Sequence, residues 1–147
     1  MFKVVVWATD GSRYAEDALA YARDFAKSSG GKLIAVHVDQ LVPSRSVGSH
    51  RLPGEEEVQQ VLRRKVEELK QEGIDAALET PTIVEGGAAH AIAELALDAG
   101  ADVIVAGTRG RGPLAGLLLG SVTHRLLQIA PCPVLTVPSS DQPPKTP

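Results

Sequence analysis

The residues best suited to chemistry in this chain are three glycines and a serine near its C-terminal end. Gly107, Gly110, Gly120 and Ser121 follow the spacing G-x2-G-x9-G-S, directly after the apolar run Asp102–Ala106. A glycine backbone lacks Cβ, so it can approach a phosphate closely and turn its N–H groups toward it. A helix that begins near Ser121 would add free amide donors and the positive end of its dipole. The spacing therefore predicts a phosphate-binding segment in a soluble nucleotide-binding domain.

An acidic residue, Asp10, occupies a second position of interest. It follows the β-branched run Lys3–Thr9 and precedes Gly11 and Ser12. Ser12 is a suitable N-cap for a following helix. We expect the Asp10 carboxylate to contact a ligand, and its alternative role is to help cap that helix.

Known catalytic patterns are missing around these residues. No lysine stands beside Ser121, so the P-loop machinery for hydrolysis is absent. The run Lys3–Thr9 is followed by Asp-Gly-Ser and lacks the dinucleotide fingerprint. The sequence pattern indicates no Ser/His/Asp or Cys/His arrangement and no metal-ligand spacing among the four histidines. A phosphate site of this kind is expected to bind a nucleotide far better than it turns one over.

Composition limits the class of protein. The 147 residues suit one domain, and aromatic residues make up only 3% of them, so the core is expected to be aliphatic. Few aromatic rings and a net charge of -3 disfavour a nucleic-acid reader. No signal-peptide pattern opens the chain and no apolar run could span a bilayer, from which we expect a cytoplasmic protein without a membrane partner. Cys132 is the single cysteine and is expected to be a small buried hydrophobe.

Strand-like and helix-like segments must position these residues, and they alternate along the chain. Strands are expected at Lys3–Thr9, Leu33–Val38, Ala76–Val84, Asp102–Ala106 and Pro133–Val137. Pro81 interrupts the third of these and suggests an edge or a bend. Helices with one apolar face are expected from Ser12 to Gly30, at Glu55–Glu72, from Gly87 to Gly100, and at about Ser121–Ile129.

This alternation predicts an α/β fold. We expect a single domain with a doubly wound, five-stranded parallel sheet in the order 3-2-1-4-5 and helices on both faces, Rossmann-like in architecture. The first and fourth strands are then neighbours at the topological switch point, where such sheets bind ligands outside the carboxyl ends of their strands. Asp10 and the segment that begins at Gly107 should therefore face one crevice.

Two segments lack periodicity. The connection Val42–Gly54 is expected to be a flexible surface loop or a lid over the site. Residues 1–138 form the expected nucleotide-binding domain, and residues 139–147 are expected to be a disordered tail. His37 is expected to satisfy a backbone group in the core, with ligand contact as the alternative.

These residues resemble a known family. The Thr9–Ser12 opening, the His37-Val38 strand end and the Gly107-Thr-Arg-Gly110 segment are similar to those of the universal stress protein family, in its ATP-binding branch. The resemblance continues through Gly120–Thr123 and the closing Pro131–Val137.

The resemblance implies roles for particular residues. Asp10 would hold the ribose or the edge of the base, and Val38 would pack on adenine or donate to it through its backbone. Ala8 and Thr9 would line the adenine side. The sugar and phosphates would be held by the glycine-rich segments, through Gly107, Arg109, Gly110, Gly120, Ser121, Val122 and the Thr123 hydroxyl. The ligand would be ATP, or AMP or another adenine nucleotide, with Mg2+ carried by the phosphates. Trp7 would fill the core, or else shape the base pocket.

The resemblance also implies a homodimer that pairs strand Val134–Val137 across a two-fold axis. The leading hypothesis is a nucleotide-dependent regulatory switch in stress adaptation. The alternatives are slow ATP hydrolysis or autophosphorylation at Ser121 or Thr123, and a nucleotide-free dimeric scaffold.

Overall fold

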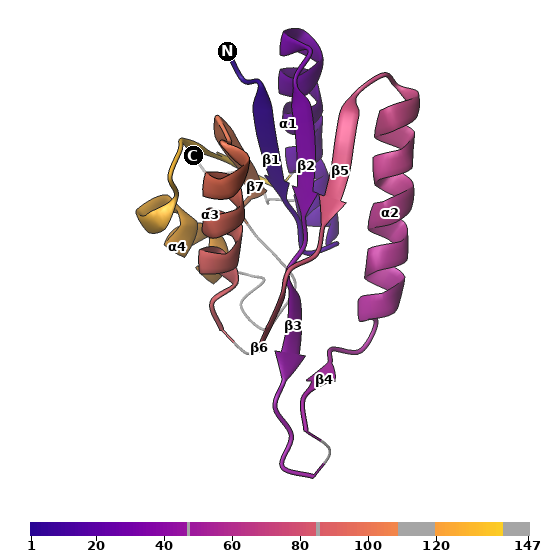
Figure 1. The fold of residues 1–147 in the computed structure, drawn as a ribbon, viewed down its shortest axis with the longest axis vertical. Helices are drawn as coiled ribbons and strands as arrows, with labels where there is room; N and C mark the ends of the chain where they lie inside the picture. Colours follow the sequence, from indigo (N-terminus) through magenta and orange to yellow (C-terminus); the bar gives the residue numbers. More distant parts are fainter. Residues whose placement is uncertain (47, 85, 109–119, 140–147) are drawn as a thin grey trace, which may run out of the picture.

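The central element of the fold is a five-stranded parallel sheet, seen in the computed structural model (Figure 1), which describes residues 1–46, 48–84, 86–108 and 120–139. Its strands are β1 (Val4–Ala8), β2 (Lys32–Val36), β5 (Asp75–Glu79), β7 (Val103–Gly107) and β8 (Val134–Val137). They run in the order β5-β2-β1-β7-β8. This is the predicted order 3-2-1-4-5, and the expected α/β doubly wound fold is confirmed.

Within the described residues, four helices cover the two faces of this sheet: α1 (Arg13–Ser29), α2 (Glu55–Gln71), α3 (Ala88–Ala99) and α4 (Ser121–Ile129). Side chains alternate across a strand, so Val5 and Trp7 of β1 point into a core with α1 and α2. Val6 points to the opposite core, which is shared with α3 and α4. Figure 1 shows α3 and α4 on one side of the sheet. The sheet is thus buried on both faces, as its continuously apolar strands predict.

The connection between β1 and α1 is fixed by two features. Trp7 is fully buried, and its indole N–H donates to the Ala15 carbonyl at 2.9 Å. Trp7 therefore fills the core between β1 and α1. Gly11 has φ +79, and a Cβ there would lie 2.5 Å from Val58 of α2, so only glycine fits this turn. Ser12 occupies the N-cap position of α1, but its side chain makes no capping hydrogen bond.

A second, smaller sheet corrects the expectation for the middle of the chain. It contains β3 (Asp39–Val42), β4 (His50–Arg51) and β6 (Thr82–Val84) in the order β4-β3-β6. β3 pairs with β4 antiparallel and with β6 parallel. The expected strand Ala76–Val84 is therefore two strands in different sheets, because the chain changes partner around Pro81. The segment Val42–Gly54, expected to be irregular, contains β4.

This small sheet lies beyond the carboxyl end of β2 (Figure 1). The amide of His37 donates to the Glu79 carbonyl at 3.0 Å and that of Asp39 to the Pro81 carbonyl at 2.9 Å. The segments after β2 and after β5 thus run side by side into the second sheet, where they form β3 and β6. The expected disordered tail falls almost wholly on residues 140–147, which lie outside the described part of the chain. Among the described residues, no helix is long and apolar enough to cross a bilayer.

Candidate functional site

A cavity of about 450 Å³ opens where β1 and β7 end and α4 begins. This volume is within the range typical of small-molecule sites, and the position is the topological switch point of the sheet. All the expected site residues that the structure describes line it: Ala8, Thr9, Asp10, Val38, Gly107, Gly120, Ser121, Val122 and Thr123. Arg109 and Gly110 lie outside the described residues. Asp10 and Ser121, which are far apart in sequence, therefore face one cavity.

Other residues of the wall were not among the expected site residues, although ligand contact was the alternative role of His37 and the segment Val42–Gly54 was a possible lid. They are Ala15, His37, Gln40, Leu52, Pro53, Glu55, Ala88, Ile92, Ala106 and Leu126. Most are apolar residues whose helical or strand periodicity only places them in a core. Gln40 belongs to β3, and Leu52 and Pro53 directly follow β4. The small sheet and the segment after it therefore both contribute to the cavity.

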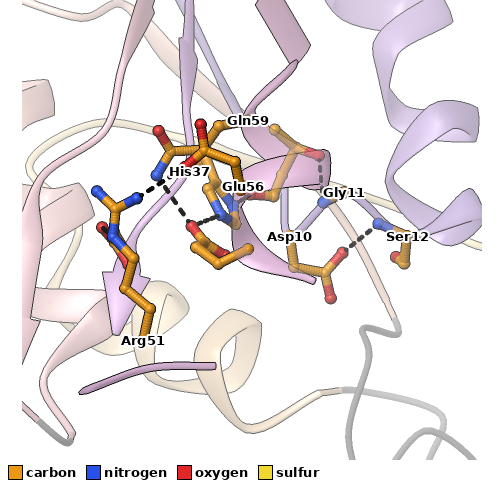
Figure 2. A network of polar contacts seen from close by, with 10 residues as sticks. Asp10, Gly11, Ser12, His37, Arg51, Glu56 and Gln59 are labelled. Atoms are coloured by element: carbon orange, nitrogen blue, oxygen red, sulfur yellow. Dashed lines mark hydrogen bonds and ion pairs between the residues drawn. The ribbon is translucent and has the colours of Figure 1, made fainter. Parts of the chain in front are cut away.

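Local hydrogen bonds fix the turn after β1. The Thr9 amide donates to the Val36 carbonyl at 3.0 Å, which keeps the turn beside β2. The Thr9 hydroxyl accepts from the Gly11 amide at 3.0 Å, and the Asp10 carboxylate accepts from the Ser12 amide at 2.9 Å. Figure 2 shows these two bonds side by side. The Asp10 carboxylate therefore contacts the start of α1 and also lines the cavity, and its contact with a ligand stays a prediction.

The start of α4 forms the opposite end of the cavity. The Gly120 amide donates to the Thr108 carbonyl at 2.6 Å, and the Thr108 amide donates to the Val137 carbonyl at 3.0 Å. These bonds hold the first turn of α4 against the ends of β7 and β8. The first amides of a helix have no acceptor within the helix. The amides of Ser121 and Val122 are therefore suited to an anion, which the helix dipole also favours.

Thr123 differs from its neighbours at this helix start. Its hydroxyl donates to the Gly107 carbonyl at 2.9 Å, and the residue is only 8% exposed. The hydroxyl proton is therefore already used to join α4 to β7. This bond positions α4 against β7, and the phosphate contact of Thr123 that the resemblance implies stays a prediction.

A buried polar pair forms the cavity wall beyond β2. His37 and Glu55 are each 3% exposed, and His37 Nε2 lies 2.6 Å from Glu55 Oε1. His37 Nδ1 lies 3.0 Å from the Thr9 carbonyl, as expected for a histidine that satisfies a core backbone group. Gln59 donates to Glu55 Oε1 at 3.2 Å. Figure 2 shows His37 and Gln59 close together in this network. Glu55 was missed because an acidic residue in a first helical turn is ordinarily a solvent-facing dipole partner.

Beside this pair, ion pairs connect β4 to its surroundings. Arg51 Nε lies 3.1 Å from the buried Asp39 carboxylate, and Arg51 Nη1 lies 3.2 Å from Glu56. These contacts join β4, β3 and the first turn of α2 (Figure 2). They fix the segment that supplies Leu52 and Pro53 to the cavity.

The single thiol does not contribute to this site. Cys132 is partly buried and packs on the core shared with α3 and α4. Burial raises the pKa of the Cys132 thiol, the negative charge of Asp102 raises it further, and a backbone hydrogen bond from Ile104 acts in the opposite direction. A thiol of this kind is a weak nucleophile at neutral pH. Among the described residues, no group of three or more His, Cys, Asp or Glu side chains could hold a metal ion.

Comparison with known proteins supplies a family. Residues 1–138 match the model of the universal stress protein family. A universal stress protein of Thermus aquaticus is 35% identical over 143 residues, covering 93% of this chain and 99% of the relative. A universal stress protein crystallised in complex with cAMP is 27% identical with a TM-score of 0.64, covering 95% of this chain and 98% of that one. A universal stress protein of Archaeoglobus fulgidus is 25% identical with a TM-score of 0.66, covering 92% and 98%.

Proposed function

We propose that this chain, which belongs to the universal stress protein family, binds ATP and acts as a nucleotide-dependent regulatory protein in the stress response. The stress role is proposed from the family alone. ATP binding is proposed from the site, and the single observation that supports it is the division of one cavity into two chemically different halves.

One half of the cavity suits phosphates. Gly107, Gly120, Ser121 and Val122 present backbone at the positive end of α4. Gly120 is the N-cap of α4 and leaves the approach to these amides without a side chain. Anion binding by amides of this kind needs no cationic side chain.

The other half suits a heterocycle. Val38, Leu52 and Pro53 offer apolar surface there. The Glu55 carboxylate on the same side offers acceptor lone pairs, as phosphate oxygens do, so a nucleotide has one favourable orientation. Its base lies toward β2 and the small sheet, and its phosphates lie toward α4.

The spacing of the strands agrees with the length of a nucleotide. β7, β1 and β2 are successive neighbours, and adjacent strands lie about 4.8 Å apart. Phosphates beside β7 and a base beside β2 are therefore roughly 10 Å apart. Asp10, which follows β1 between them, faces the sugar and is placed to accept from its hydroxyl groups.

Related structures support an adenine nucleotide as the ligand. The relative at 27% identity was crystallised with cAMP, which carries the same base. We favour ATP over AMP or a cyclic nucleotide because the glycine-rich spacing offers amides for more than one phosphate. Mg2+ would enter with the phosphates, since this ion commonly keeps its waters and takes few protein carboxylates.

We also propose that two copies pair through β8. This strand is an outer strand of the five-stranded sheet, next to β7 only. An apolar outer strand is open to pairing with another chain, and a symmetric dimer is the commonest outcome.

Calorimetric titration with ATP and with AMP, in the presence of magnesium, tests the proposed ligand. We expect saturable binding of ATP and a loss of at least about tenfold in affinity for Asp10→Ala. Asp24→Ala, which removes an exposed aspartate of α1, should bind like the wild type. Absence of binding at millimolar ATP, or an equal loss in both variants, would contradict the proposal.

A further inference from the structure

Glu55 is a buried carboxylate at the wall of the cavity whose role the phosphate site does not explain. It is the first residue of α2, it is 3% exposed, and it lines the cavity on the β2 side. A carboxylate is rarely buried to this degree unless its oxygens have partners, because burial without them is costly. Its hydrogen bonds therefore decide what it can offer a ligand.

Both hydrogen bonds that the Glu55 carboxylate makes within the described part of the chain fall on Oε1. His37 Nε2 lies 2.6 Å from this atom, and Gln59 Nε2 donates to it at 3.2 Å. His37 and Gln59 are themselves buried, at 3% and 8% exposure. The carboxylate is thus held by two buried side chains on the same oxygen, and neither of these bonds uses Oε2.

The protons of this pair can be counted. A carbonyl oxygen only accepts, so His37 Nδ1, at 3.0 Å from the Thr9 carbonyl, carries a proton. The short contact between His37 Nε2 and Glu55 Oε1 needs one further proton between the two atoms. That proton belongs either to His37 or to Glu55. In both cases Oε2 carries only lone pairs, so it accepts and never donates.

We propose that Glu55 selects the base of the nucleotide by accepting a hydrogen bond from the exocyclic amino group of adenine. This inference rests on the proposed function, because it assigns a role within the same cavity. His37 and Gln59 are positioning residues that aim the acceptor. Hypoxanthine carries a carbonyl in place of this amino group. Its carbonyl oxygen and the Glu55 carboxylate oxygen would then be two acceptors facing each other, with no proton between them.

The surroundings of Glu55 favour a base over a sugar as its partner. Val38, Leu52 and Pro53 give this side of the cavity apolar surfaces suited to the faces of a planar ring. Asp10 already supplies a carboxylate beside β1, nearer the phosphate half. A buried acceptor at the far end is therefore suited to the edge of the base, where an unmatched polar group is rejected strongly.

The test compares ATP with inosine triphosphate, which carries hypoxanthine in place of adenine, by calorimetric titration of the full chain. Wild-type protein is expected to bind ATP at least about tenfold more tightly, equal to about 1.4 kcal/mol. Glu55→Gln replaces one of the two oxygens by a donor, and we expect the ratio of the two affinities to fall below about threefold. Glu57→Gln makes the same change at an exposed glutamate of the same helical turn that does not line the cavity, and should keep the wild-type ratio.

The outcomes separate this inference from the proposed function. If the wild type binds neither nucleotide, the proposed function fails. If it binds both equally, or if Glu55→Gln keeps the full preference for ATP, nucleotide binding stands and the role of Glu55 is wrong. Equal binding of both nucleotides by the wild type is also the result expected if Glu55 contacts the sugar. Glu55→Ala, checked for folding by circular dichroism, gives a second variant in which the ratio should approach one.

Discussion

The Gly120 amide donates to the Thr108 carbonyl at 2.6 Å, so the N-cap residue of α4 is joined to the residue that follows β7. This bond places the first turn of α4 at the end of β7, where Asp10 of the neighbouring strand end faces the same cavity. The strand order makes this arrangement possible, since β1 and β7 are adjacent although they are far apart in the sequence.

A side chain at Gly120 should prevent binding without unfolding the protein. Gly120 has φ -65 and ψ 153, which valine adopts readily, so Gly120→Val should fold. Its side chain would occupy the approach to the amides of α4, and we expect ATP affinity to fall at least about tenfold in calorimetry. Unchanged affinity would show that the phosphates do not bind at the start of α4.

Gly30→Ala is the matched control for that variant. Gly30 has φ 61, a Cβ at this residue would meet no atom within 4 Å, and the residue ends α1 away from the cavity. Alanine in this left-handed conformation should cost about 1–2 kcal/mol of unfolding free energy and leave ATP affinity unchanged. Comparing the two variants thus separates a loss of stability from a loss of ATP affinity.

The five strands, their order and the four helices could be predicted from the sequence. Continuous apolar runs indicate strands buried on both faces, and glycines such as Gly30 and Gly100 end the helices where the periodicity stops. The small sheet could not be predicted. Its strand β4 consists of the exposed residues His50 and Arg51, which no hydrophobic pattern reveals, and β6 was expected only as the end of one longer strand.

The candidate site was predictable only in part. Motif spacing located Asp10, Gly120 and Ser121, because the topology of a doubly wound sheet brings such strand ends together. Glu55 was not predictable, because its burial depends on His37, which lies 18 residues earlier with β3 and β4 between the two. A lone glutamate at a helix start carries no sign of such a partner.

Trp7→Phe should weaken the fold and spare the site. The variant loses the hydrogen bond to the Ala15 carbonyl and part of a fully buried ring, and we expect a loss of about 1–3 kcal/mol. Trp7 is the single tryptophan, so urea unfolding should be followed by circular dichroism. ATP affinity should remain at the wild-type value, and a large loss of affinity would show that Trp7 shapes the base pocket instead.

The thiol of Cys132 should react slowly in the folded protein. Its raised pKa leaves less thiolate at neutral pH than a free cysteine has, because the neutral thiol is favoured. Alkylation followed by mass spectrometry should therefore be several-fold slower than for a small thiol and should accelerate with rising pH and on unfolding in urea. A rate in the native protein equal to that of a small thiol would contradict the burial of this residue.

A proline in β8 tests the proposed dimer. The Pro133 carbonyl accepts from Ile104 of β7, and the Val137 carbonyl accepts from Thr108, just after β7. The backbone groups of every second residue from Pro133 to Val137 therefore face β7, and those of Thr136 face the open edge. Thr136→Pro removes one outward N–H and should keep the pairing with β7. Sedimentation should show a dimer for the wild type and a weaker dimer for the variant. A monomeric wild type would rule out this interface.

A crystal structure of the wild-type protein grown with ATP and magnesium tests the central claim most directly. We predict phosphate oxygens within about 2.7–3.2 Å of the Ser121 and Val122 amides, the ribose beside Asp10 and the base against Val38. A nucleotide bound in the reverse orientation, or bound away from the start of α4, would contradict this arrangement.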